Sequence, residues 1–175
     1  PKASIDAGLG MVHQHFTLAD NLSVLDNIIL GTQSIWDFRL QHREAGDRIL
    51  GLGSRFGLGV DLHARVAELS MGERQRVEIL KALYRNARIL ILDEPTAVLT
   101  PQESRTLFKT LRQLLDEGLS IIFISHKLAE VLEVSDRIVV LRDGKLVLEV
   151  NVSEASEEIL AEAMVGRSFK MPIRK

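Results

Sequence analysis

A chain of 175 residues, 46% hydrophobic and 26% charged, is long enough for one domain with a hydrophobic core. Its 22 basic and 24 acidic residues give a formal charge of -2, so no basic excess indicates a nucleic-acid partner. The lack of cysteine excludes disulfides and cysteine-ligated zinc, and the apolar runs are too short to span a bilayer.

The first half of the chain is predicted to be mostly helical. A short apolar stretch at residues 9–12 precedes helical patterns around residues 24–30 and 39–56. Another helix is expected over residues 70–85, with apolar side chains recurring on one face. We therefore expect a helical lobe inserted between the strands of an α/β core.

The second half alternates predicted strands and helices. Residues 88–93 form a continuous apolar run, typical of a strand buried on both faces of a parallel sheet. Thr100 followed by proline and Glu103 predicts a helix start, and Gly118 is placed to end that helix. The remaining elements are a strand at 120–125, a helix at 127–134, a strand at 137–142, a hairpin turn at Asp143-Gly144 leading into a strand at 145–150, and a helix at 156–165.

Two adjacent carboxylates, Asp93 and Glu94, follow the run ILIL at the predicted carboxyl end of a strand. In α/β sheets, ligands bind at this end of the strands. One carboxylate can hold Mg²⁺ through water, while its neighbour orients and deprotonates an attacking water. Taken alone, the run is equally well interpreted as an acidic turn that Pro95 ends.

A second candidate site is the sequence LSMGERQR at residues 69–76. Ser70 with Glu73 three residues later forms a helix-capping box, which is one interpretation. A helix N-terminus that carries a serine hydroxyl and the flexible Gly72 is also a ready anion site. The order of the motifs favours the second interpretation, because Asp93-Glu94 ends one buried strand and Ser125-His126 ends the next.

In this order the motifs resemble the nucleotide-binding domain of ABC transporters. Residues 69–75 resemble the family's Leu-Ser-Gly-Gly-Gln signature and residues 89–94 its Walker B strand. Residues 96–100 resemble the D-loop, and His126 the switch histidine. Val12-His13-Gln14 resembles the Q-loop.

The resemblance is strongest to importers of simple sugars and nucleosides, on residues 78–85, 93–101 and 164–167. The ATPase subunits of these importers carry two such domains in one chain, and this sequence resembles the first. The resemblance implies one partial domain: an incomplete P-loop NTPase (RecA-like) α/β core with a parallel sheet and an inserted α-helical subdomain. The implied boundaries are 1–14 and 86–166 for the core, 15–85 for the helical subdomain with its signature helix, and 167–175 for the start of a linker.

The resemblance also implies a role for each matching residue. Asp93, with Gln14, would hold Mg²⁺, Glu94 would be the general base, and His126 would link the γ-phosphate of ATP to the catalytic water. Gln14 would sense the metal and the water and move with the helical lobe. The residues implied to bind the nucleotide of an opposing domain are Ser70, Met71, Gly72, Glu73 and Gln75.

The implied partners are transmembrane permease subunits, a second ABC ATPase domain in the same chain or another copy, and indirectly a solute-binding protein. Residues 16–31 would form much of the surface that receives a permease helix. The implied location is cytoplasmic, peripheral on the inner face of the cell membrane. No nucleic-acid partner is expected.

The sequence departs from the family pattern at several positions. Met71 replaces a signature glycine, Glu73 the glutamine, and Thr100 the usual D-loop aspartate. The motif Gly-x-x-x-x-Gly-Lys-Ser/Thr is absent, so no loop of backbone amides and lysine is expected to cradle the phosphates. This loop is expected to lie upstream of Pro1, which would make the chain inactive by itself.

Two functions are therefore predicted, of which the first is an ABC-type ATPase that powers solute import. The alternative is a non-catalytic interaction module that docks on a permease or another partner. An intact Asp93-Glu94 pair with His126 favours the ATPase for the parent protein, and the missing phosphate loop favours the module for these 175 residues. A chromosome-type ABC ATPase would need a long coiled-coil insertion, which the sequence lacks.

Overall fold

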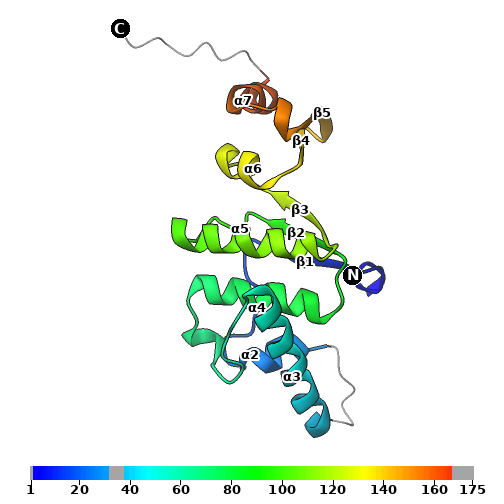
Figure 1. The fold of residues 1–175 in the computed structure, drawn as a ribbon, viewed down its shortest axis with the longest axis vertical. Helices are drawn as coiled ribbons and strands as arrows, with labels where there is room; N and C mark the ends of the chain where they lie inside the picture. Colours follow the sequence, from blue (N-terminus) through cyan, green and yellow to red (C-terminus); the bar gives the residue numbers. More distant parts are fainter. Residues whose placement is uncertain (1, 32–37, 167–175) are drawn as a thin grey trace. The chain divides into compact units, whose positions relative to one another are not determined.

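The computed structural model describes residues 2–31 and 38–166, so the predicted linker at 167–175 lies outside the described residues. The chain divides into two compact units, of which the first ends at Ile124 and the second begins at Ser125. Figure 1 labels most helices and strands of the two units. Among the described residues, no helix is long and apolar enough to cross a membrane.

The first unit contains a three-stranded parallel sheet in the order β1-β2-β3. Its strands are β1 (Leu9–Val12), β2 (Ile89–Asp93) and β3 (Ser120–Ile124). Val12 lies beside Leu92, and Leu92 beside Phe123, so the three strands run in register toward the same edge. This arrangement confirms the predicted α/β core with a parallel sheet.

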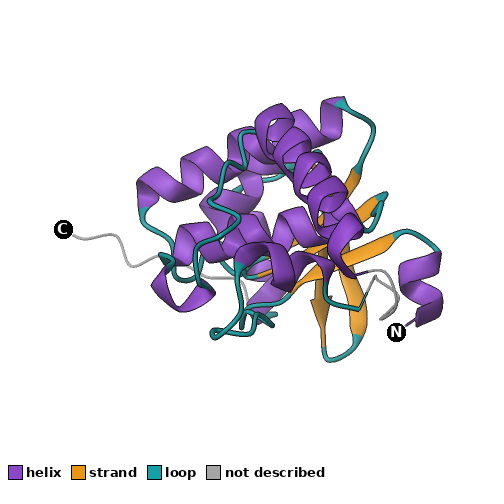
Figure 2. Ribbon diagram, turned by 90° about the horizontal axis from the view of Figure 1, so that it is seen from below, coloured by secondary structure: helices purple, strands orange, loops and turns teal. Residues whose placement is uncertain are grey.

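Helices cover one face of this sheet, as Figure 2 shows for the orange strands and the purple helices. The covered face carries buried Val12, Leu90 and Leu92, and the ring of Phe123 meets Phe108 edge to face at 6.1 Å. Gly10 on β1 faces Ala82 so closely that an added Cβ would lie 2.9 Å from the alanine Cβ. Only glycine therefore allows β1 to pack this tightly on the helix that carries Ala82.

The opposite face of the sheet differs from the sequence prediction of strands buried on both faces. Met11, Ile122 and Ile124 are 44%, 50% and 44% exposed, and the register places all three on the same face as Ile91. The apolar run does predict strands, but it cannot tell whether a second layer covers the sheet, because burial depends on which elements pack there. The prediction of two buried faces is therefore wrong for this structure.

The helical lobe of the first unit packs on the same side as the covered face. Its main helices are α2 (Val24–Ile29), α3 (Phe38–Phe56) and α4 (Met71–Tyr84), with the 3-10 turn η1 (Val66–Glu68) before α4. Figure 1 shows α4 between the sheet and the other two helices. Burial of at least 99% of the surface marks the lobe's core, which consists of Val24, Ile28, Ile49, Leu58, Val66, Val77, Ile79 and Leu80.

Two long helices of this unit begin as the sequence predicts. Ser70 caps α4, and Thr100 caps α5 (Pro101–Asp116), each through a complete capping box with the glutamate three residues later. Gly118, at φ 90°, follows the end of α5, where its left-handed conformation lets the chain turn back into β3. A short helix, α1 (Lys2–Asp6), precedes β1.

The second unit is built around an antiparallel hairpin of β4 (Arg137–Arg142) and β5 (Lys145–Asn151). Asp143 and Gly144 form its turn with φ angles of 52° and 72°, which confirms the predicted Asp-Gly hairpin. The helices α6 (Leu128–Val134) and α7 (Glu157–Val165) pack on each other, and α7 also packs on β4 around buried Leu160. The short turn η2 (Val152–Glu154) joins β5 to α7.

Candidate functional site

The carboxyl end of β2 carries the predicted metal ligand Asp93 and the predicted general base Glu94, both half-buried. Glu94 has a φ of 49°, although it is not glycine. Its backbone N–H donates to the Ile124 carbonyl at 2.9 Å, and its carbonyl accepts from the Ala97 N–H at 3.1 Å. Such a conformation costs on the order of 1–3 kcal/mol and is concentrated at functional sites, where the surrounding structure holds it. The turn therefore fixes the backbone at Glu94, from which its side chain leaves the end of β2.

Gln14 follows β1 at the same edge of the sheet. β1 ends at Val12, which lies beside Leu92, and exposed Gln14 is two residues further on. Because β1 and β2 are parallel, Gln14 and the Asp93-Glu94 pair leave the sheet at the edge where α/β folds bind ligands. The structure thus places all three predicted residues after strands that end at the same edge of the sheet.

The predicted metal ligands lie at the same edge. Within residues 2–31 and 38–166, no group of three or more His, Asp or Glu side chains could hold a metal ion. Mg²⁺ in nucleotide sites is typically bound by one or two carboxylates, with waters and substrate phosphates completing the shell. A single half-buried carboxylate at Asp93 fits that mode of binding.

The N-terminus of α4 carries the second predicted site. The Ser70 backbone N–H and hydroxyl both donate to Glu73 Oε2, at 2.9 and 2.8 Å, and the Glu73 N–H donates to Ser70 Oγ at 3.3 Å. These bonds from the Ser70 backbone and then its hydroxyl lower the pKa of Glu73, and the nearby Arg76 guanidinium acts in the same direction. The hydroxyl expected to bind phosphate thus already donates to a carboxylate of its own helix.

Gly72 and Gln75 of the same motif face α5 rather than open solvent. A Cβ on Gly72 would lie 2.5 Å from Glu103 Oε1, while the other oxygen of Glu103 accepts from the Thr100 N–H and hydroxyl. Gln75 is only 3% exposed, and its side-chain amide has no hydrogen-bond partner among the described residues. It lines a cavity of about 90 Å³ between α4 and α5, which has room for ordered water. Met71 is exposed.

His126 belongs to the second unit, where it is exposed in the turn before α6. Along the chain it comes two residues after Ile124, the last residue of β3. The turn is closed by a hydrogen bond of 3.1 Å from the Lys127 N–H to Ser125 Oγ. His126 thus follows a parallel strand as the sequence predicts.

Comparison with known proteins identifies this arrangement. A family model described as ABC transporter matches residues 1–97, more than half of the chain. The chain belongs to the ABC transporter family. A nucleotide-binding domain of this family, with an α/β core and a helical lobe, is what the motif order predicted.

Similar ABC proteins carry names of import ATPases. The chain is 49% identical over 175 residues to the nucleoside import ATP-binding protein NupA of Lactococcus lactis subsp. cremoris, covering 100% of this chain and 35% of that protein. It is 47% identical over 195 residues to the glucose import ATP-binding protein TsgD13 of Haloferax volcanii, with coverage of 95% and 36%. A ribose import ATP-binding protein of Escherichia coli O157:H7 is 41% identical, with coverage of 95% and 33%. The chain spans about a third of the length of these relatives.

Solved ABC cassettes share the fold. A crystal structure of an ATP-binding cassette of an ABC transporter in its ADP conformation aligns with a TM-score of 0.77 at 22% identity, covering 95% of this chain and 72% of the other. A nucleotide-free ATP-binding cassette from an ABC transporter aligns with a TM-score of 0.73 at 22% identity, covering 86% and 64%. At this identity the likeness establishes the ABC cassette fold alone.

Several residues around the ABC motifs could not be found from the sequence. Glu103 was recognised as a capping residue, but its contact with Gly72 joins two helices that begin about thirty residues apart. Thr17, Asn27 and Glu78 lie in segments that the resemblance singled out, but nothing in the sequence gave them the role of holding the segment after Gln14 in place. Only the tertiary packing brings these side chains to the site.

Proposed function

We propose that this chain is part of the ATP-binding and ATP-hydrolysing subunit of an ABC importer that powers uptake of a simple sugar or a nucleoside. The observation that carries the proposal is the Asp93-Glu94 pair at the carboxyl end of β2, with Glu94 held at φ 49° and Gln14 leaving the neighbouring parallel strand. The names of the nucleoside, glucose and ribose import relatives support the solute class.

In the proposed mechanism, ATP binds with Mg²⁺, which neutralises charge that develops on the phosphates. Asp93 would hold the ion through water, together with Gln14. Glu94 would accept a proton from the attacking water, with its backbone held at the end of β2. His126 would contact the γ-phosphate and orient the same water.

A second ABC ATPase domain, in the same chain or in another copy, is the proposed partner for nucleotide binding. Ser70, Met71, Gly72, Glu73 and Gln75 would face the γ-phosphate bound by that domain. For Ser70 to donate to a phosphate, its hydroxyl must leave Glu73 Oε2, and the lowered pKa keeps Glu73 charged at neutral pH. Phosphate contact at this helix is therefore expected to be weaker than with a neutral side chain at position 73.

The other proposed partners are transmembrane permease subunits, which would dock on residues 16–31, and indirectly a solute-binding protein. The subunit would then be cytoplasmic and peripheral on the inner face of the cell membrane. As an alternative, the chain is an interaction module without catalysis. The lack of a Gly-x-x-x-x-Gly-Lys-Ser/Thr motif in these 175 residues supports the expectation that they bind ATP poorly when purified alone.

The test is Glu94→Gln in the full-length protein assembled with its permease. Removal of the general base should lower ATP turnover by about 10²–10⁴-fold while ATP still binds. Glu133→Gln, an exposed position on α6, is the control and should keep normal turnover. Turnover close to normal in Glu94→Gln would show that Glu94 is not the general base. Titration of residues 1–175 with Mg-ATP in a calorimeter tests the expected weak binding, which micromolar affinity would contradict.

A further inference from the structure

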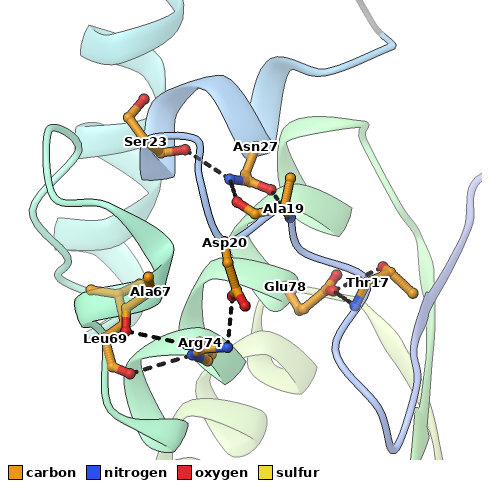
Figure 3. Close-up of polar contacts among 9 residues, drawn as sticks. All are labelled: Thr17, Ala19, Asp20, Ser23, Asn27, Ala67, Leu69, Arg74 and Glu78. Carbon is orange, nitrogen blue, oxygen red and sulfur yellow. Dashed lines mark hydrogen bonds and ion pairs between the residues drawn. The ribbon is translucent and has the colours of Figure 1, made fainter.

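A segment without regular secondary structure, residues 16–22, leads from the Gln14 turn to helix α2. We call this segment the strap. Figure 3 shows that side chains of α4 and α2 hold it at several points. Thr17, near its start, donates from its backbone N–H and from its hydroxyl to the same oxygen, Glu78 Oε1, at 2.7 and 2.9 Å.

Glu78 is a charged residue on the inner, buried face of α4, where charged residues are unusual. It is 4% exposed and stands between the buried apolar residues Val77 and Ile79. A buried carboxyl group is destabilising unless hydrogen bonds compensate it. Both hydrogen bonds to Glu78 Oε1 among the described residues come from Thr17, so the strap supplies the compensation.

The backbone N–H groups of Val66 and Ala67 donate to the Leu22 and Asp20 carbonyls of the strap, both at 3.1 Å. Two further attachments involve side chains. Arg74, one turn before Glu78 on α4, donates to Asp20 at 2.9 Å and also to the Leu69 carbonyl at 3.3 Å. Asn27 of α2 accepts from the Ala19 N–H at 2.7 Å and donates to the Ala19 carbonyl at 3.0 Å. Asp20 is largely exposed, so its ion pair with Arg74 contributes little by itself. The Thr17–Glu78 contact, whose acceptor Glu78 is buried, is therefore the stronger link between the strap and α4.

This link connects two parts of the proposed machinery. Thr17 is three residues after Gln14, and Glu78 is eight residues after Ser70 on one unbroken helix, a distance of about 12 Å along its axis. Because α4 is packed along its buried face, it should move as one body. A displacement of the strap at Thr17 would then shift the Ser70 end of the helix as well.

We propose that Glu78 is a positioning residue that transmits movement of the strap to the Ser70 end of α4. The inference rests on the proposed importer function, in which a permease docks on residues 16–31. Glu78 would not touch ATP. Its role would be to make the response of the ATPase to solute depend on contact between the strap and α4.

The test measures the ratio of solute-stimulated to unstimulated ATPase activity in the full-length protein, assembled with its permease and binding protein. Glu78→Ala removes the acceptor, and Thr17→Val removes only the hydroxyl. We expect each to lower the ratio, roughly fivefold for Glu78→Ala and less for Thr17→Val, at the lower end of typical coupling between sites. Glu78→Gln retains a carbonyl oxygen at the same distance and should restore most of the ratio, whereas the shorter Glu78→Asp should not.

Thr110→Val is the matched control for a purely structural effect. Thr110 is buried, whereas Thr17 is exposed, and the Thr110 hydroxyl donates to the Phe56 carbonyl at 3.2 Å, far from the strap in sequence. Thr110→Val should therefore lose at least as much thermal stability as Thr17→Val but keep the stimulation ratio. An equal fall of the ratio in Thr110→Val would overturn the positioning role of Glu78.

The outcomes separate this inference from the function on which it rests. If the wild-type assembly hydrolyses ATP without any response to solute, the importer function fails and the inference fails with it. If the wild type responds normally and Glu78→Ala and Thr17→Val respond as strongly, only the inference fails. Thr17→Val keeps the test usable if Glu78→Ala does not fold, because it removes one hydroxyl from an exposed residue.

Discussion

Replacement of Asn27 by alanine should lower the stability of the first unit. The expected loss is larger than the difference in helix propensity between the two residues can account for. Asn27 is 1% exposed, and its side chain makes three hydrogen bonds: from the Ala19 N–H at 2.7 Å, to the Ala19 carbonyl at 3.0 Å and to the Ser23 carbonyl at 2.9 Å. Each such bond contributes about 0.5–1.5 kcal/mol net. Asn27→Ala should therefore lower the free energy of unfolding by about 3 kcal/mol, since the alanine leaves the Ala19 backbone groups without their partner.

Urea unfolding followed by circular dichroism measures this change. With a slope of about 2 kcal/mol per molar urea, the midpoint should fall by about 1.5 M. Asn21→Ala is the control, because Asn21 is exposed and lies in the same strap, and it should change stability by less than about 0.5 kcal/mol. A loss below about 1 kcal/mol in Asn27→Ala would refute the reasoning, because water would then satisfy Ala19 as well as the asparagine does.

Two further predictions concern the α4 N-terminus. Gly72→Ala should destabilise the unit by about 1 kcal/mol in urea unfolding, because its Cβ would force Glu103 out of the Thr100 capping box. In a Glu103→Ala background the same change should be neutral or stabilising, and additive effects in this double-mutant cycle would contradict the contact. Hydrogen bonds from Ser70 lower the pKa of Glu73 in the folded state. The ionised Glu73 carboxylate therefore stabilises the fold fully above its unfolded-state pKa, near 4.5, and this stabilisation is lost as the pH falls through the lower folded-state pKa. Between pH 7 and pH 3, Glu73→Gln should therefore lose less stability in urea unfolding than the wild type, and equal losses would exclude this linkage.

Much of the fold could be predicted because its signals are local. The capping boxes at Ser70 and Thr100 and the hairpin turn at Asp143-Gly144 each depend on residues within three or four positions of one another. The backbone there forms the predicted structure whatever packs around it. The catalytic proposal has the same basis, because adjacent carboxylates after an apolar strand must emerge at the strand's end.

The family resemblance implied that Gln14 and Asp93 hold one metal ion. The register of β1 on β2, which the sequence did not predict, brings the ends of the two strands before these residues to one edge of the sheet. The roles of these residues in hydrolysis stay predictions. The exposed face of the sheet at Met11 and Ile122 was not foreseen, because an apolar run predicts a strand but not the layer that covers it.

Contacts between distant residues were decided only by the tertiary structure. Thr17 and Glu78 are 61 positions apart, and no pattern in either segment marks the other as its partner. Glu103 meets Gly72 because α4 and α5 pack with their N-termini together. The positive φ of Glu94 turns the chain out of β2, after its N–H has bonded the Ile124 carbonyl of the next strand, into a turn in which its own carbonyl accepts from the Ala97 N–H. Sequence periodicity records which face of an element is apolar, whereas a buried hydrogen bond depends on the position of two elements relative to each other, which only the packed core determines.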